Sequence, residues 1–376
     1  MEWESYELGE LLLYEQPTPY IVESTNYDDS FKTPVLTAGK SFILGYTNEK
    51  DGIFDRLPVI IFDDFTTASQ YVNFRFKVKS SAMKLLTPVK ELVLPKFIYY
   101  RMQIVNFDHS THKRYWIQQY SKIRVSIPPL SEQKCIVARI EELFSELDKV
   151  VETLKTVKEQ LAVYRQAVLK EAFLPYTSHE MLDKLSERIF DGPFGTNLKT
   201  EDYVNSGVRV VRLENIKNMW FDDSKKSYVT KDKYETIKKH TIRPTDLIMS
   251  TFISDSIKVC QMPNYIEFAV NKADCVGIRL KQEYLPKFYM YYLSQNDTYR
   301  TLENLVHGAT RPRVNTKQIK SIMVPLCSFD EQVKTVERIE KRLSYCDAIE
   351  QSVDHILQRS ETLRQSILEK ALNGSI

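Results

Sequence analysis

Two stretches of this chain contain neither glycine nor proline, and each predicts one unusually long helix. The first covers residues 130–174 and has a proline on either side. The second covers residues 326–373, with a proline before it and a glycine after it. Proline is tolerated where a helix begins, and proline or glycine commonly follows where a helix ends. At about 1.5 Å per residue, a helix of roughly 40 residues is a rod of roughly 60 Å.

The apolar residues of both stretches recur at heptad spacing. In the first stretch the steps alternate between four and three residues without interruption, which indicates a coiled-coil seam. The second stretch has a weaker seam, because Cys346 and Ser360 occupy two of its positions. The seam of the first stretch consists of Ile136, Ile140, Leu143, Leu147, Val150, Leu154, Val157, Leu161, Tyr164 and Val168.

The two stretches are copies of one another at an offset of 199 residues. Of the 41 positions from 132 to 172, 12 are identical to their counterparts, and most of these identities are polar, unlike the apolar matches that any two coiled coils share. The preceding segments also match, since Leu-Pro-Lys-Phe occurs at 94–97 and again at 285–288. The chain is therefore a duplicated unit, with a globule and a long helix in each copy.

The segments outside the long helices predict globules of mixed α and β structure. We expect an α+β chain with domains at 1–128, 129–175, 176–325 and 326–376, of which the second and fourth are the long helices. Two matching helices with matching seams can pair with one another. Strands are expected from β-branched and aromatic content at 59–62, 72–78, 208–213 and 275–280, and short helices at 97–102 and 288–293.

The net charge of +2, from 52 basic and 50 acidic side chains, conceals an uneven distribution. Residues 1–70 carry 4 basic and 13 acidic side chains, whereas residues 71–131 carry 11 and 2. Residues 174–329 carry 23 basic and 18 acidic side chains, and both long helices are slightly acidic. Basic side chains gathered on the globules favour binding to nucleic-acid phosphates, and a solvated surface with salt bridges is the alternative explanation.

The sequence predicts no catalytic residue and no metal site. It has no apolar run that would span a membrane, no secretory signal, and five cysteines without zinc-ligand spacing, which together indicate a cytoplasmic protein. His109 and His112 lack a third ligand, and the pairs at 63–64 and 222–223 are expected to be solvated aspartates in turns. Neither a phosphate-binding loop nor an adenine-methyltransferase tetrapeptide is present.

Three segments combine basic, amide, hydroxyl and aromatic side chains, as DNA-reading surfaces do. Two of them, 109–116 and 307–315, precede the long helices at similar distances, and the third, 74–80, is expected to be a strand with its charges on one face. Arginine pairs with guanine and asparagine with adenine in the major groove. The predicted DNA contacts in and near these segments are Thr66, Thr67, Lys77, Lys79, Lys84, His109, His112, Lys113, Arg114, His307, Thr310, Arg311, Arg313 and Asn315.

The chain resembles the DNA-specificity subunit of type I restriction–modification systems over essentially its whole length. The resemblance rests on Ile-Pro-Pro-Leu-Ser-Glu-Gln at 127–133, on Arg-Gln-Ala-Val-Leu at 165–169, and on the repeats Asp-Glu-Gln at 330–332 and Leu-Arg-Gln-Ser-Ile-Leu at 363–368. The second globule opens with Asp-Gly-Pro-Phe-Gly-Thr-Asn-Leu-Lys at 191–199, which is similar to a common target-recognition-domain pattern. The resemblance adds Phe194, Lys199, Arg212 and Asn215 to the expected DNA contacts.

The resemblance implies two different target recognition domains, each of which reads one half of a bipartite, asymmetric DNA site. It implies that the long helices pair antiparallel in a pseudo-two-fold internal repeat, fix the gap between the half-sites and dock two methylation subunits. Those partners use S-adenosylmethionine to methylate adenine N6, after flipping the base out of the duplex. The restriction subunits use ATP and magnesium as motor-nucleases, so this chain itself is expected to bind no cofactor.

Two other functions stay open from the residues alone. A coiled-coil scaffold without a DNA role would share the long helices, but the uneven charge counts against it. A self-sufficient methyltransferase or nuclease would need motifs that this sequence lacks.

Overall fold

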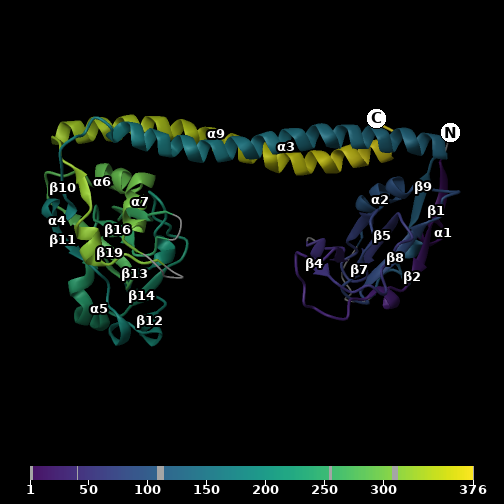
Figure 1. Cartoon of the computed structure of the whole chain (residues 1–376), viewed down its shortest axis with the longest axis horizontal. Helices are drawn as coiled ribbons and strands as arrows, with labels where there is room; N and C mark the ends of the chain where they lie inside the picture. The colour runs from purple at the N-terminus through teal and green to yellow at the C-terminus, as the bar shows by residue number, and fades with distance from the viewer. Residues whose placement is uncertain (1–2, 40, 108–113, 254–255, 307–311, 376) are drawn as a thin grey trace. The chain divides into compact units, whose positions relative to one another are not determined.

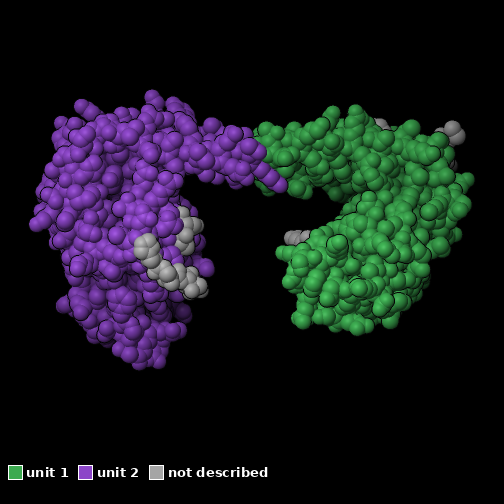
Figure 2. All heavy atoms as spheres, viewed as in Figure 1, with its two compact units in different colours: residues 1–154, 354–376 green, residues 155–353 purple. Residues whose placement is uncertain are grey.

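The computed structural model describes residues 3–39, 41–107, 114–253, 256–306 and 312–375. The chain divides into two compact units, which Figure 2 shows in different colours. Unit 1 consists of residues 1–154 and 354–376, and unit 2 of residues 155–353. Each unit therefore contains one globule and a length of both long helices.

The two long helices form as the sequence predicts, with α3 at Leu130–Phe173 and α9 at Phe329–Leu372. Ser328 precedes α9 as its cap, because the Ser328 backbone N–H donates to the Glu331 carboxylate at 2.9 Å and the Glu331 N–H donates to Ser328 Oγ at 3.4 Å. Among the described residues, no helix combines the length and the apolar character that a membrane span requires.

The long helices pair antiparallel within each unit. In unit 1 the start of α3 shares a core with the end of α9, through Ile136 and Ile140 on one helix and Leu368 and Leu372 on the other. In unit 2 the end of α3 shares a core with the start of α9, in a cluster that includes Val168, Leu169, Val336 and Ile339. Burying these apolar seams against one another stabilises the pair, as in a coiled coil.

A four-stranded antiparallel sheet is repeated in the two globules, which confirms the duplication (Figure 1). The strand order is β2-β8-β5-β6 in unit 1 and β11-β19-β16-β17 in unit 2, so each strand has a counterpart. The bounds are β2 Leu12–Glu15, β5 Val59–Asp63, β6 Ser69–Val72, β8 Met83–Pro88, β11 Ser186–Phe190, β16 Leu247–Ser250, β17 Val259–Gln261 and β19 Cys275–Leu280.

One short helix in each unit joins this sheet to the long helices. In unit 1, α2 (Pro95–Gln103) contributes Phe97 to the core that contains Ile60 of β5 and Ile140 of α3. In unit 2, α6 (Pro286–Leu293) contributes Phe288 to the core that contains residues of β16 and α3. Figure 1 shows α2 and α6 between the sheets and the long helices.

Each globule is closed where its two ends meet. In unit 1, β1 (Glu4–Glu7) pairs antiparallel with β9 (Arg124–Ile127), and in unit 2, β10 (His179–Met181) pairs antiparallel with β20 (Met323–Pro325). The last strand of each globule leads directly into a long helix. Smaller helices complete the units: α1 Leu8–Leu11, α4 Leu182–Leu185, α5 Lys231–Ile237, α7 Asn296–Glu303 and α8 Thr316–Lys320.

The globules differ in their second sheet. Unit 1 has three strands in the order β4-β3-β7, and unit 2 has five in the order β12-β14-β13-β18-β15. The two copies have therefore diverged on the part of the globule that the second sheet builds. The bounds are β3 Thr33–Leu36, β4 Ile43–Thr47, β7 Lys77–Val78, β12 Tyr203–Val204, β13 Val208–Val211, β14 Ser227–Val229, β15 Thr241–Ile242 and β18 Ala269–Asn271.

The predicted strand at 72–78 is wrong in its middle. Val72 ends β6, and only residues 77–78 form β7, so the residues between them connect two different sheets. The expected charged face is also absent from this described segment, because Arg75 and Lys79 are exposed whereas Lys77 is buried. Local alternation of charge cannot reveal that the chain changes sheets here.

Candidate nucleic-acid interface

In both units, a segment that precedes a long helix is hydrogen-bonded to the end of an inner strand of the four-stranded sheet, which is β5 in unit 1 and β16 in unit 2. In unit 1 the backbone N–H of Tyr115 donates to the carbonyl of Asp64, which follows β5, at 2.9 Å. In unit 2 the N–H of Val314 donates to the carbonyl of Thr251, which follows β16, also at 2.9 Å. Tyr115 and Val314 are 199 residues apart, so the attachment is duplicated. We call these sites junction 1 (residues 64–65 with 114–116) and junction 2 (residues 251–252 with 312–314).

A buried ion pair between Lys84 and Asp64 stabilises junction 1. The Lys84 side chain is 1% exposed and Asp64 is 2% exposed, with Lys84 Nζ 3.5 Å from Asp64 Oδ2. Lys84 Nζ also donates to the Ser81 carbonyl at 2.9 Å, while Asp64 Oδ1 accepts the backbone N–H of Trp116 at 2.8 Å. Burial lowers the pKa of Lys84, and the charge of Asp64 opposes that shift. Lys84 thus supports the junction from inside.

Exposed groups surround junction 1. Arg114 is exposed and lines a small cavity of about 160 Å³ together with Asp64 and Lys84. The turn after β5 is ordered by Asp63, whose carboxylate accepts the backbone N–H of Phe65 at 2.8 Å and of Thr66 at 3.0 Å. Thr66 is exposed in this turn, and its neighbour Thr67 has a positive φ of 57°.

Arg313 lies in junction 2, and Asn315 follows the junction. The Arg313 side chain is 55% exposed. Asn315 caps α8, since its side chain accepts the backbone N–H of Gln318 at 2.9 Å. This bond occupies the carbonyl oxygen that an adenine contact would also use.

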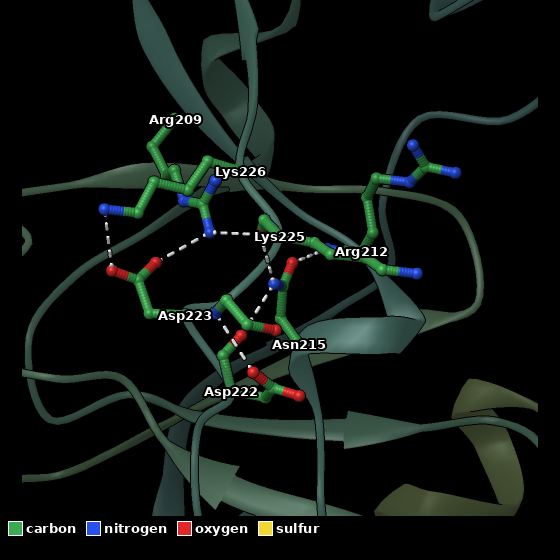
Figure 3. Close-up of polar contacts among 8 residues, drawn as sticks. Arg209, Arg212, Asn215, Asp222, Asp223, Lys225 and Lys226 are labelled. Carbon is green, nitrogen blue, oxygen red and sulfur yellow. Dashed lines mark hydrogen bonds and ion pairs between the residues drawn. The ribbon is translucent and has the colours of Figure 1, made fainter. Parts of the chain in front are cut away.

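Asn215 has a structural role that its sequence context does not reveal (Figure 3). It is 1% exposed, and its Nδ2 donates to the backbone carbonyls of Asp222 and Lys225, each at 2.8 Å. Its Oδ1 accepts the N–H of Arg212 at 2.9 Å. With its amide occupied, Asn215 orders the 222–225 turn, which Arg209 also holds through Asp223 at 2.8 Å.

The other predicted contacts fall into two groups. Lys77 is buried, pairs with Glu49 at 2.7 Å and donates to the Asp51 carbonyl at 2.8 Å, so it is engaged inside unit 1. Exposed or half-exposed positions are held by Lys79, Phe194, Lys199 and Arg212, of which Lys199 pairs with Glu201 and Arg212 with Glu214.

Six predicted contacts lie outside the described residues. Within the described residues there is no group of three or more His, Cys, Asp or Glu side chains that would hold a metal ion. The expectation that Asp64 is a solvated turn residue is wrong, because Asp64 is 2% exposed and pairs with Lys84. The 199-residue spacing of Arg114 and Arg313 marks the place of the junctions but does not reveal Thr251, Phe252 and Asp274, which build junction 2. The six undescribed residues are His109, His112, Lys113, His307, Thr310 and Arg311.

Comparison with known proteins places this architecture in a family. The family model described as type I restriction modification DNA specificity domain matches residues 1–161 and 194–357. The chain is 30% identical to the EcoR124I/EcoR124II type I restriction enzyme specificity subunit of Escherichia coli, over 98% of this chain and 92% of that protein. It is 24% identical to the EcoKI specificity subunit of Escherichia coli, over 68% of this chain and 58% of that protein.

Solved structures share the fold. A chain from a study of complex assembly and conformational transition of the type I R-M system aligns with a TM-score of 0.71 and 16% identity, covering 100% of this chain and 98% of that one. The HsdS subunit from Thermoanaerobacter tengcongensis aligns with a TM-score of 0.53 and 16% identity, covering 100% and 97%. Because the family model matches most of its residues and a relative is 30% identical over nearly its whole length, this duplicated chain belongs to the type I restriction–modification DNA specificity family.

Proposed function

We propose that this chain is the sequence-specific DNA-binding subunit of a type I restriction–modification complex and performs no chemistry of its own. The observation that carries the proposal is the duplicated junction, where each unit holds the segment before a long helix at the end of the same inner strand. Arg114 and Arg313, both exposed, lie at matching positions of the two junctions. Two copies of one exposed, basic site suit a DNA target that has two parts.

The difference between the second sheets supports an asymmetric target. A three-stranded sheet in unit 1 and a five-stranded sheet in unit 2 give the globules different surfaces beside similar junctions. We therefore assign one half-site to the recognition domain within residues 1–128 and a different half-site to that within 176–325. The proposed contacts among the described residues are Thr66, Thr67, Lys79, Arg114, Phe194, Lys199, Arg212 and Arg313. Lys77, Lys84 and Asn215 are left out because they are engaged inside the protein, and Asn315 is left out because its side-chain oxygen caps α8.

The long helices within 129–175 and 326–376 are proposed to dock two methylation subunits and to fix the gap between half-sites. The pairing of the two helices leaves some positions of the predicted seam exposed, and apolar residues are exposed on these helices in both units. In unit 1 these include Val150 (48% exposed) and Leu363 (50%), and in unit 2 Tyr345 (60%) and Ile349 (46%). Partner helices that cover such positions would bury apolar surface in a helix bundle.

The partners would supply the chemistry. In this proposal the methylation subunits bind S-adenosylmethionine and modify adenine N6, and restriction subunits use ATP and magnesium. We expect the complex to act on double-stranded DNA in the cytoplasm.

Co-expression with the cognate methylation subunit tests the proposal. The expected result is N6-methyladenine at one bipartite motif, located by sequencing the methylated genome. Exchanging residues 1–125 for those of a relative should change one half of the motif and keep the other. Absence of methylation, or an unchanged motif after the exchange, would overturn the proposal. The scaffold alternative predicts that the assembled complex shows no salt-dependent DNA binding.

A further inference from the structure

Arg313 is held from two sides at junction 2. Its guanidinium carbon lies 4.3 Å from the ring centroid of Phe252, and its Nη1 lies 3.4 Å from Asp274 Oδ1. The side chain is nevertheless 55% exposed, whereas that of Asp274 is only 22% exposed. The side chain of an exposed arginine ordinarily samples many rotamers. Here the ring of Phe252 and the carboxylate of Asp274 both restrain the guanidinium.

The backbone of junction 2 fixes this arrangement. Phe252 and Arg313 face one another in an antiparallel β-bridge, which places their side chains on the same face. Hydrogen bonds on both sides of the bridge hold it, from Val314 N–H to the Thr251 carbonyl at 2.9 Å and from Ile253 N–H to the Pro312 carbonyl at 3.3 Å. The ring and the guanidinium are therefore stacked because of strand register.

Asp274 is itself held in place. Its Oδ1 accepts the hydroxyl of Thr251 at 3.1 Å, and its carbonyl accepts the Thr251 N–H at 2.9 Å. Its φ of 69° is a left-handed backbone conformation that aspartate and asparagine tolerate better than most residues. The carboxylate is thereby fixed toward Arg313 before any ligand arrives.

This geometry leaves one edge of the guanidinium available. Asp274 faces Nη1, and no hydrogen bond from a described residue engages Nε or Nη2 of Arg313. Two parallel N–H donors on a fixed plane match O6 and N7 of guanine in the major groove. Because the side chain is already ordered, binding costs less conformational entropy than for a free arginine.

We propose that Phe252 and Asp274 are positioning residues that orient Arg313 to read one guanine of the half-site recognised by unit 2. The proposal rests on the DNA-recognition function proposed above and deepens it. Unit 1 offers a counterpart, since Arg114 is 199 residues earlier and Phe65, 47% exposed, follows Asp64 as Phe252 follows Thr251.

The test uses the full chain in complex with its methylation subunit and a DNA library randomised over both half-sites. Arg313→Ala should abolish the preference at one base pair of the unit 2 half-site, reducing discrimination there by about 5- to 150-fold. Phe252→Ala and Asp274→Asn should reduce preference at the same base pair by smaller factors. Phe252→Tyr, which keeps a ring under the guanidinium, should retain it.

Two controls separate positioning from folding. The unit 1 half-site must stay unchanged in every variant. Arg188→Ala should alter no preference, although Arg188 also stacks on a phenylalanine, 4.5 Å from the Phe190 centroid. Asp274→Asn suits the left-handed backbone and keeps an oxygen for Thr251, so it carries the test if Phe252→Ala does not fold.

Three results would overturn the inference: unchanged base preferences in Arg313→Ala, equal weakening at all positions as for a phosphate contact, or preferences in Phe252→Ala and Asp274→Asn that match the wild type. Each leaves the proposed function standing, provided that the wild-type complex methylates a bipartite motif. A wild-type complex that methylates no motif contradicts the proposed function itself.

Discussion

Gln133 and Gln332, which lie 199 residues apart, make matching hydrogen bonds in the two units. Each is fully buried near the start of a long helix, and its Oε1 accepts, at 2.7 Å, the backbone N–H of the leucine that opens the Leu-Pro-Lys-Phe segment. Each Nε2 donates to a backbone carbonyl just before its helix, at 2.8 Å from Gln133 and 3.1 Å from Gln332. The two glutamines tie each globule to its long helix.

Gln133→Ala should lower the free energy of unfolding of unit 1 by about 1–3 kcal/mol, because it leaves buried backbone groups without partners. Gln332→Ala should have the same effect on unit 2. Urea unfolding followed by circular dichroism measures both. Gln160→Ala, on the exposed face of α3, is the control, and a Gln133 variant as stable as this control would contradict the assigned role.

Lys84→Met should destabilise unit 1 by about 3–5 kcal/mol, because it leaves the Asp64 carboxylate buried without its cation. Adding Asp64→Asn removes that charge while keeping an oxygen for the Trp116 N–H, so the double variant should be more stable than Lys84→Met alone. Denaturant unfolding of the two variants decides the point. A double variant no more stable than the single one would mean that the ion pair does not brace junction 1.

Acidification should destabilise unit 2 through His240. Burial lowers the pKa of His240, whose Nδ1 donates to the Asp191 carbonyl at 2.6 Å. The unfolded chain therefore takes up a proton first as the pH falls through the ordinary histidine value of about 6.5, and the stability present above that pH is lost below it. Burial raises the pKa of the Asp191 carboxyl, which acts in the opposite direction.

His240→Gln should flatten the fall in Tm between pH 7.5 and 5.5 by removing the histidine contribution. His179→Gln, at an exposed position of the same unit, is the matched control. Thermal scans across this range compare the two variants with the wild type. Parallel curves for wild type and His240→Gln would rule out a contribution from this histidine.

Ile349→Glu should weaken assembly with the methylation subunit without unfolding the chain, because Ile349 is 46% exposed on α9. A charge buried against an apolar partner surface is costly. Size-exclusion chromatography of the co-expressed proteins measures assembly. Lys155→Glu, an exposed charge change on α3, should leave it intact, and equal assembly in both variants would argue against docking at this face.

Removing a heptad from both long helices, residues 150–156 and 354–360, should shorten the gap in the recognised motif by about three base pairs. Seven residues correspond to about 10 Å of helix, and one base pair to about 3.4 Å. Matched deletions keep the antiparallel seam in phase. Methylome sequencing reads the new gap, and an unchanged gap with both half-sites intact would contradict the spacing role.

The sequence predicts the long helices from two stretches without glycine or proline, and it predicts the duplication from identities that recur at an offset of 199 residues. Both α3 and α9 form within the predicted stretches. It does not predict the surroundings of Lys77, Lys84 and Asn215, whose polar character suggests the surface. Lys77 and Lys84 are buried by acidic partners, Glu49 and Asp64, that lie at least 20 residues away in the chain. Such pairing depends on tertiary contacts, which the local pattern of residues along the chain does not reveal.

The way the units divide the chain affects the order in which they are completed during synthesis. Unit 2 is one continuous segment and has all its residues once position 353 has been made. Unit 1 contains the first globule, yet its core includes Leu368, Ala371 and Leu372 at the other end of the chain. The globule that leaves the ribosome first is thus completed last, and it must keep an apolar surface uncovered until residue 372 has been made.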